Sequence, residues 1–532
     1  MQPKGQVKYY RSAVDGELHP YAVCATDTTD EPVALIIEVS PGAISDLPRA
    51  VEDTQELVSS AAKHGYPCVA VRPTGRGPGS VYQNYGEVDV LEVIEEVVGN
   101  YKIDRDRISI TGASMGGAAV WYLISHYPDK FAAAAPIAGY CDYRLWEKPG
   151  GLNFHMHEWE EPSWKSRSAA FLVENLRHTP VWIVHGEWDR AIGGGVPVEH
   201  SRQMARFMAE KGFAHTYTEL PKTGHDSRTP EVLDMVVPWL LEQTKAREPD
   251  HVSLTTFDLR LNRSYWSAIE QLERYGERGR VDVRLGDGRA EVTTQNVRAL
   301  SLGPVTQRDP STIVIDGVEV GQADLSRERT FRRDKDGAWT AAGAVPSSEK
   351  RHGSSGPIGD LFFDGAVLVP GAAGTAEETH FNTWVAESAA RRYRATNGGV
   401  HRGGIPGENW VDLPINTDSE VLADTLVSRN LILYGNYRSN SVLAGYERTL
   451  PLRFDGDTIR LADKSYTAEK AAVFAVFPHP DNAQRYVAVH GGVTPDAIAW
   501  ERFDMNLLPD FVVYSGGKLL DWGFWSNDWR SQ

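Results

Sequence analysis

The chain has 532 residues, enough for about two to four domains, and its 41% hydrophobic and 24% charged residues are typical of globular proteins. This composition excludes a wholly disordered chain, a collagen-like fibre and a coiled coil. The net charge of −17 argues against nucleic acid and against anionic membrane surfaces as partners. The three scattered cysteines form neither a disulfide framework nor a zinc motif.

The compartment is inferred from three features of the sequence. No stretch reaches about 18 uninterrupted apolar residues, so we expect no membrane-spanning helix. The first residues lack the apolar run of a secretory signal, and sparse cysteines fit a reducing compartment. We therefore expect a cytoplasmic protein, or a secreted one if a signal was removed.

The first half of the chain alternates strand-like and helix-like patterns. Apolar runs predict strands at 33–39, 66–71, 107–110, 132–137 and 180–184. Helical spacing of apolar residues predicts helices at 48–63, 87–99, 116–126, 198–211 and 230–245. This alternation predicts an α/β domain with a mostly parallel sheet over residues 1–248.

The second half of the chain has a different pattern. A charged, proline-containing stretch at 246–251 predicts a linker. Beyond it, residues 252–532 carry short β-type runs separated by Gly, Asp and Asn, interrupted by a helical pattern at 376–395. We expect an α+β or β-rich domain there, built as one unit or as two subdomains.

A G-x-S-x-G motif lies between a predicted strand and a predicted helix. Gly112 and Gly116 flank Ser114, and such a strand–turn–helix context exposes the serine hydroxyl at the edge of the sheet. The backbone N–H of Met115 would then point at a developing oxyanion, next to the positive end of the helix. The alternative is a glycine-rich turn with an incidental serine. We interpret Ser114 as a nucleophile.

A serine nucleophile needs a base, and the base needs a carboxylate to orient it. Asp189 follows the predicted strand at 180–184, and His225 follows a later β-type run. The order Ser114, Asp189, His225 is the order that this kind of motif requires. Two other carboxylates lie nearby, Glu187 and Asp226. The neighbouring His185 is interpreted as a buried, hydrogen-bonded histidine.

A second oxyanion donor is expected in the loop after an early strand. Pro41 lacks an N–H, which leaves Gly42 as the first choice and Ala43 as the second.

The long segment between the strands at 132–137 and 180–184 carries three tryptophans. Trp146, Trp159 and Trp164 either line a substrate pocket as a roof over the site or pack the segment against itself. His155 and His157 are not expected to bind metal, because no further ligand is spaced to join them.

The first half resembles α/β-hydrolases of the prolyl oligopeptidase and polyhydroxybutyrate-depolymerase-like esterase group. The matching stretches are residues 10–23, 75–97, 101–139, 180–189 and 224–225. The resemblance implies a triad of Ser114, Asp189 and His225 that hydrolyses a carboxylic ester or peptide without a cofactor. One departure is Ser40-Pro41, where these esterases usually carry His-Gly. The second half resembles a region found behind such domains in some large bacterial proteins.

Three functions remain open from the sequence. The leading hypothesis is a serine hydrolase that forms an acyl-enzyme with a small-molecule ester, or with a short peptide. The same acyl-enzyme could instead transfer its acyl group to an amine or alcohol, or cyclise. The alternative from another class is a binding protein with a degenerate hydrolase domain. No metal or other cofactor is expected, and the chain could form a homodimer.

Overall fold

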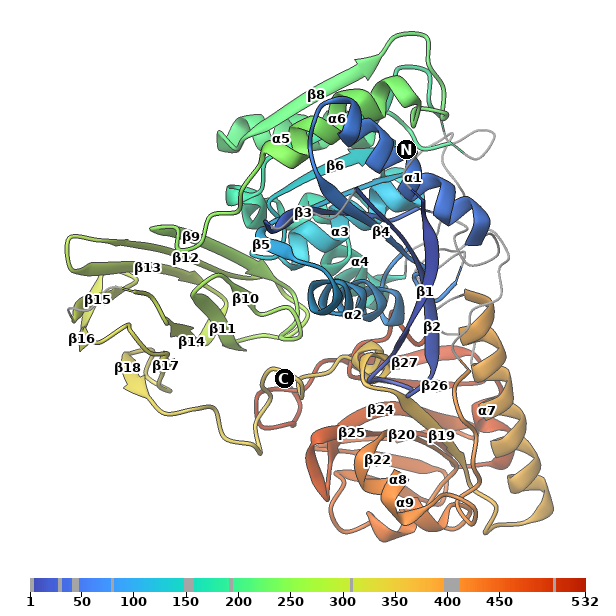
Figure 1. Ribbon diagram of the computed structural model, residues 1–532. Helices are drawn as coiled ribbons and strands as arrows, with labels where there is room; N and C mark the ends of the chain where they lie inside the picture. Colours follow the sequence, from blue (N-terminus) through green and yellow to red (C-terminus); the bar gives the residue numbers. More distant parts are fainter. Residues whose placement is uncertain are drawn as a thin grey trace.

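The computed structural model describes residues 4–26, 31–40, 47–77, 81–147, 157–190, 195–306, 310–396, 412–500 and 504–532. Three groups of elements follow one another along the chain (Figure 1). The first group, drawn in blue to green, surrounds an eight-stranded sheet. Among the described residues, no helix combines the length and apolar character needed to cross a membrane.

The eight-stranded sheet has the order β1-β2-β4-β3-β5-β6-β7-β8. Its strands from β4 to β8 are parallel, whereas β1 and β2 are antiparallel additions at one edge. The strand bounds are β1 (Gln6–Arg11), β2 (Leu18–Ala25), β3 (Val33–Glu38), β4 (Cys68–Pro73), β5 (Ile103–Ala113), β6 (Ala133–Ile137), β7 (Val181–Gly186) and β8 (His215–Leu220). The central strands are almost wholly buried, as their apolar runs predict.

Helices cover both faces of this sheet. On one face α1 and α6 pack residues such as Leu57 and Val236 against the strands. On the other face α2, α3 and α5 contribute Val93, Leu123 and Met204. The helix bounds are α1 (Leu47–Lys63), α2 (Tyr85–Asn100), α3 (Met115–His126), α4 (Glu161–Ser166), α5 (Glu199–Lys211) and α6 (Pro230–Glu242), with 3₁₀ turns η1 (Tyr143–Glu147), η2 (Glu158–Glu160), η3 (Ala169–Phe171) and η4 (Val173–His178). The predicted α/β architecture is confirmed.

Two five-stranded sheets form the second group, drawn in green to yellow (Figure 1). Their orders are β10-β11-β14-β17-β18 and β16-β15-β13-β12-β9, and side chains from both sheets meet in one apolar core. The bounds are β9 (His251–Thr256), β10 (Arg263–Ser264), β11 (Ser267–Leu272), β12 (Gly279–Gly286), β13 (Arg289–Gln295), β14 (Val297–Leu302), β15 (Ser311–Ile315), β16 (Val318–Ala323), β17 (Arg329–Arg333) and β18 (Trp339–Ala342).

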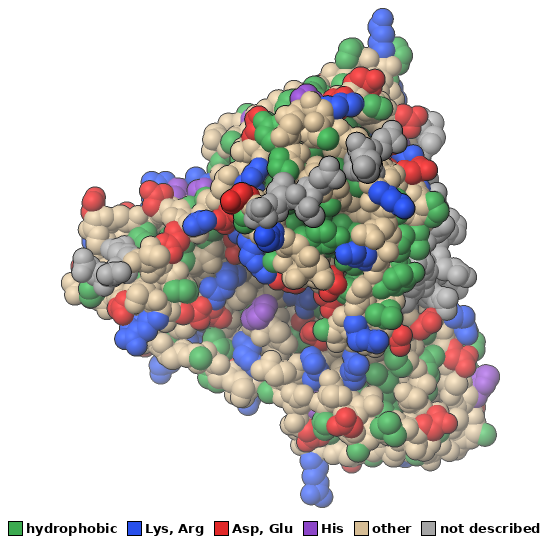
Figure 2. Space-filling view, in the orientation of Figure 1, with side chains coloured by type: hydrophobic (Ala, Val, Ile, Leu, Met, Phe, Trp, Pro, Cys, Tyr) green, Lys and Arg blue, Asp and Glu red, His purple; other side chains and the backbone are tan. Residues whose placement is uncertain are grey.

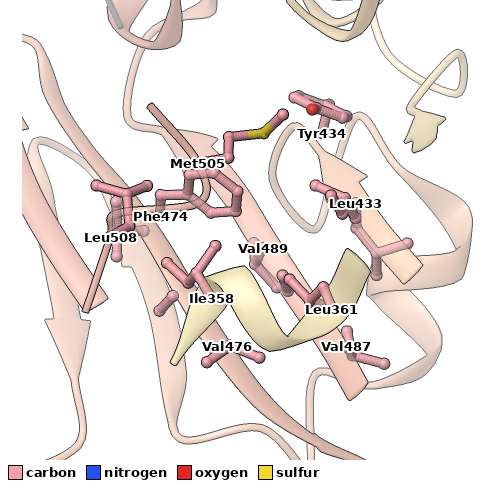
Figure 3. Close-up of a cluster of buried hydrophobic side chains, with 14 of the residues drawn as sticks. Ile358, Leu361, Leu433, Tyr434, Phe474, Val476, Val487, Val489, Met505 and Leu508 are labelled. Atoms are coloured by element: carbon pink, nitrogen blue, oxygen red, sulfur yellow. The ribbon is translucent and has the colours of Figure 1, made fainter. Parts of the chain in front are cut away.

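The third group contains a six-stranded mixed sheet with the order β19-β20-β25-β24-β26-β27 and a small sheet β21-β22-β23. Helix α7 runs along the large sheet, and Figure 3 shows Ile358 and Leu361 of η5 packed against Phe474 and Val489. The bounds are η5 (Ile358–Phe363), β19 (Ala366–Pro370), α7 (Ala376–Thr396), α8 (Ala423–Ser428), β20 (Asn430–Tyr434), α9 (Ser441–Gly445), β21 (Leu452–Asp455), β22 (Thr458–Leu461), β23 (Lys464–Thr467), β24 (Ala471–His479), β25 (Asn482–Gly492), η6 (Pro495–Trp500), β26 (Phe511–Ser515) and β27 (Lys518–Gly523). The predicted β-rich character of the second half is confirmed.

Candidate active site

Ser114 occupies the sharp turn between β5 and α3. Its backbone has φ 58° and ψ −118°, a region that residues with a Cβ rarely adopt. The turn brings the main chain against the end of β3. A Cβ on Gly112 would lie 2.0 Å from the carbonyl oxygen of Val39, and one on Gly116 would lie 1.8 Å from it. Glycine at both positions is therefore a steric requirement of the turn.

His225 lies in the loop after β8 and faces the serine. Its Nε2 atom is 2.8 Å from Oγ of Ser114, and its Nδ1 atom is 2.8 Å from Oδ2 of Asp189. Because a carboxylate only accepts, Nδ1 carries the hydrogen and Nε2 is free to accept the serine proton. The His225 side chain is 30% exposed, whereas that of Asp189 is 1% exposed. The structure thus brings the three predicted residues into one hydrogen-bonded chain.

Asp189 follows β7 and is held from both sides. Oδ1 accepts the backbone N–H of Val196 at 3.0 Å, while Oδ2 contacts His225 and also Nε2 of His185 at 3.1 Å. Burial raises the pKa of Asp189, but the hydrogen bonds that His185 and His225 donate to it outweigh this effect and leave the pKa below its usual value. The carboxylate is therefore ionised at neutral pH.

The competing carboxylate Glu187 points elsewhere. Its Oε2 accepts the backbone N–H of Lys222 at 2.9 Å, on the turn after β8. In the structure, Asp189 is the carboxylate that contacts the imidazole of His225.

The two predicted oxyanion donors differ in what the structure describes. The N–H of Met115 belongs to the first turn of α3, where N–H groups have no intrahelical partner. Gly42 lies outside the described residues. Ser40 ends the described part of that loop, and its N–H already donates to the hydroxyl of Tyr82 at 3.1 Å. A donor from this loop would therefore come from beyond Ser40.

The three predicted substrate-binding tryptophans have different surroundings. Trp164 is 1% exposed and packs in an apolar cluster with Met115, Tyr143 and Leu507. Trp159 is half-buried, stacks on His157 and packs against the core of the third group. The side chain of Trp146 and all of His155 lie outside the described residues. The substrate role of these tryptophans stays a prediction.

Two residues from the second half of the chain, Asn506 and Leu507, contact the first half near the turn that carries Ser114. The carbonyl of Leu507 accepts a hydrogen bond from Ser163 Oγ at 3.3 Å, and the Leu507 side chain is fully buried in the same cluster as Met115. Asn506 accepts a hydrogen bond from Asn84 at 3.0 Å. Neither contact could be predicted from the sequence, because each joins residues more than 300 positions apart.

His185 and Val196 were also not predicted to contact the carboxylate. The only sequence signal was a histidine at the end of a buried strand, four residues before Asp189. Among the described residues, no group of three or more His, Cys, Asp or Glu side chains is arranged to hold a metal ion.

Comparisons with known proteins indicate the protein class of the first half of the chain. The model of the prolyl oligopeptidase family matches residues 57–247. Together with the strand order, this match confirms the predicted α/β-hydrolase fold and the predicted resemblance to the prolyl oligopeptidase group. The match also supports the prediction that the first half is an enzyme domain of the serine hydrolase class.

Individual relatives match part of the chain. An uncharacterized secreted protein of Arthroderma benhamiae is 30% identical over 259 residues, which are 45% of this chain and 27% of that protein. Poly(3-hydroxyalkanoate) depolymerase C of Paucimonas lemoignei is 36% identical over 63 residues, 12% of this chain and 15% of the depolymerase. The chain thus spans about a quarter or less of these relatives. The solved structure of a thermostable esterase is 24% identical, with TM-score 0.35, and the match covers 45% of this chain and 63% of the esterase.

Proposed function

We propose that the chain hydrolyses a carboxylic ester through an acyl-enzyme on Ser114. The observation that carries the proposal is the hydrogen-bonded chain from Asp189 through His225 to Ser114, with both contacts at 2.8 Å. This is the arrangement in which an imidazole can remove the hydroxyl proton as the oxygen attacks a carbonyl carbon. The polyester depolymerase among the relatives supports an ester before a peptide as the first substrate class.

In the proposed mechanism each residue has one task. Ser114 Oγ bonds to the carbonyl carbon while Nε2 of His225 takes its proton, and the carbonyl oxygen becomes an oxyanion. The N–H of Met115 and the positive end of α3 stabilise that charge. The bond between the carbonyl carbon and the leaving oxygen then breaks as the protonated imidazole gives its proton to that oxygen. The alcohol departs, and the acyl group stays bound to Ser114. Water then gives a proton to His225 as its oxygen bonds to the acyl carbon. The bond from that carbon to Ser114 Oγ breaks, Oγ takes the proton back from His225, and the acid is released.

Asp189 keeps its charge throughout the cycle. Its Oδ2 holds Nδ1–H of His225 and stabilises the imidazolium that forms in each half of the reaction. Since the pKa of Asp189 lies below its usual value, it does not take up the proton near neutral pH. The mechanism requires a neutral imidazole on His225, because only an unprotonated Nε2 can accept the serine proton.

The proposal is tested by treating the folded protein with a fluorophosphonate and measuring its intact mass. We expect one adduct, mapped to the peptide that contains Ser114, and none in Ser114→Ala or in heat-denatured protein. Ser114→Ala should also reduce kcat for p-nitrophenyl esters by roughly 10⁶-fold, the loss seen when a triad serine is removed.

Three other results would redirect the assignment. Turnover of aminoacyl amides without esters would make the protein a peptidase. Acyl products formed only with an added amine or alcohol would indicate transfer. Folded wild-type protein that takes no label would favour the binding-protein hypothesis.

A further inference from the structure

His185 is a buried histidine outside the Ser114–His225 pair that touches the same carboxylate oxygen as His225. Its Nε2 lies 3.1 Å from Oδ2 of Asp189 and 3.0 Å from the carbonyl oxygen of Val196, and its Nδ1 lies 2.7 Å from Oγ of Ser201. The His185 side chain is fully buried. Every polar atom of the ring therefore has a partner.

These contacts fix the tautomer of His185. Both partners of Nε2 are oxygens that only accept, so Nε2 carries the hydrogen. The hydroxyl of Ser201 can donate to Nδ1, so one neutral imidazole satisfies all three contacts. Ser201 is itself buried, in the first turn of α5, and Val196 lies in the segment just before that helix.

We infer that His185 is a positioning residue for the proposed reaction. Its Nε2–H holds Oδ2 of Asp189 where His225 meets it, while Val196 N–H holds Oδ1 from the opposite side. The carboxylate plane is thereby fixed before substrate arrives. The bond from His185 also draws negative charge away from His225, which moderates how strongly Asp189 stabilises the imidazolium.

Other ionisable groups lie in the surroundings of His185 and Asp189. His200 on α5 is fully buried, and burial lowers its pKa to about 3, so it stays neutral. Glu219 on β8 is paired with Arg202 and Tyr217, and the hydrogen bond from Arg202 lowers its pKa to about 2. Asp142 is bound by Arg144, and its pKa also lies below the usual value. Each of these groups keeps one charge state between pH 5 and 8.

The inference rests on the proposed function, and substitutions separate the two. His185→Met removes the donor but keeps much of the volume, whereas His185→Gln keeps an amide N–H for Oδ2. His200→Met is the matched control, because it removes a neighbouring buried histidine that is hydrogen-bonded to Cys141 and not to Asp189. All variants are compared as folded protein, with active sites titrated by the fluorophosphonate.

We expect His185→Met to lower kcat by about 10- to 100-fold, the worth of one hydrogen bond to a charged group, with KM within about twofold. The acid limb of its pH–rate profile should move to higher pH, because the unshared carboxylate holds the imidazolium more strongly. His185→Gln and His200→Met should both stay within about threefold of wild type, with an unmoved acid limb.

Nitrogen-15 NMR of histidine-labelled wild-type protein tests the same inference without turnover. A neutral Nε2–H tautomer for His185 supports it. An Nδ1–H tautomer overturns it, even where His185→Met fails to fold. An unchanged kcat and acid limb in folded His185→Met also overturns it, as does equal damage in His185→Gln. If folded wild-type protein neither reacts with the fluorophosphonate nor hydrolyses esters, the proposed function is wrong. The positioning role of His185 is then wrong as well.

Discussion

At Gly116 the side chain is limited to hydrogen by a backbone atom from another element. The atom is the carbonyl oxygen of Val39, just after β3, which lies 1.8 Å from the place of a Cβ. A carbonyl in a buried strand end cannot swing aside as a flexible side chain would. The nucleophile turn and the end of β3 are therefore packed against one another at Gly116, as they are at Gly112.

Gly116→Ala should lower the free energy of unfolding by about 1–3 kcal/mol or more, because the new methyl group must displace the main chain. Denaturation by urea measures the change. Gly99→Ala is the control, since a Cβ there meets no atom within 4 Å and the residue lies in α2. It should stabilise the protein by up to about 1 kcal/mol. A wild-type midpoint for Gly116→Ala would contradict the steric argument.

The sequence was sufficient for part of the site and insufficient for the rest. The order of Ser114, Asp189 and His225, each after a strand, predicted which residues the sheet would bring together. The partner of Gly116 and the second histidine on Asp189 were out of reach, because each contact depends on how distant strands lie side by side. The sequence indicated only that His185 is buried, and burial alone does not identify its hydrogen-bond partners.

At the scale of elements, one buried ion pair joins the loop of His225 to the end of β3. Arg228 donates from Nε to Oε1 of Glu38 at 2.6 Å and from Nη2 to Oε2 at 3.1 Å. Glu38 is fully buried, and its Oε1 also accepts the hydroxyl of Ser40 at 3.2 Å. The pair thus connects the loop of the proposed base to the strand that precedes the expected oxyanion donor.

Arg228→Ala should cost about 3–5 kcal/mol of stability, because it leaves the carboxylate of Glu38 buried without its cation. Adding Glu38→Gln should recover part of the loss, since the double variant leaves no unpaired charge at the fully buried position 38. Thermal and urea denaturation of both variants measure this coupling. Equal stability of the single and double variants would show that Glu38 is not the group left unpaired.

An exposed ion pair provides the contrast. Arg105 and Glu95 form a two-contact pair on the surface, with side chains more than half exposed. Acidic and basic side chains are interspersed over the face of the molecule in Figure 2, where water screens such pairs. Arg105→Ala should therefore cost less than about 1 kcal/mol.

Elements differed in how well they could be predicted. The buried strands and the amphipathic helices of the first half follow their apolar patterns, and α7 at Ala376–Thr396 matches its helical pattern. The antiparallel strands β1 and β2 at one end of the sheet were not predicted. Most residues of the edge strand β1 are exposed or half-buried, so β1 carries no apolar run. The sheet orders of the second half depend on pairings between strands far apart in the chain, which local patterns do not contain.

At the scale of the whole molecule, charged groups from three parts of the chain meet at one junction. Arg260, just after β9, stacks on the ring of Phe363 at 3.4 Å and lies 3.6 Å from Oδ1 of Asp360. The other oxygen of Asp360 accepts the hydroxyl of Tyr486 at 2.5 Å. The charge of Glu87, on α2 of the first group, also favours the protonated form of Arg260.

Asp360 makes this junction sensitive to pH. Burial raises the pKa of Asp360 to about 6, although the charge of Arg260 and the hydrogen bond from Tyr486 both lower it. Because the folded-state pKa lies above that of an unfolded aspartate, the folded protein binds more protons between about pH 4 and 6. The contribution of Asp360 to stability therefore decreases as the pH rises through this window, and it stays low above about pH 6.

Asp360→Asn keeps an oxygen to accept from Tyr486 and removes the charge, so its stability relative to wild type should increase from pH 4.5 to 7.5. The full change expected from the shifted pKa is about 2–3 kcal/mol. Urea denaturation of both proteins at closely spaced pH values measures it. Asp528→Asn is the control for the loss of one aspartate charge, because that side chain is 60% exposed and lies outside the junction. If the difference in stability between Asp360→Asn and wild type does not change with pH, water and Arg260 together solvate the carboxylate. The junction would then hold the charge of Asp360 without a loss of stability.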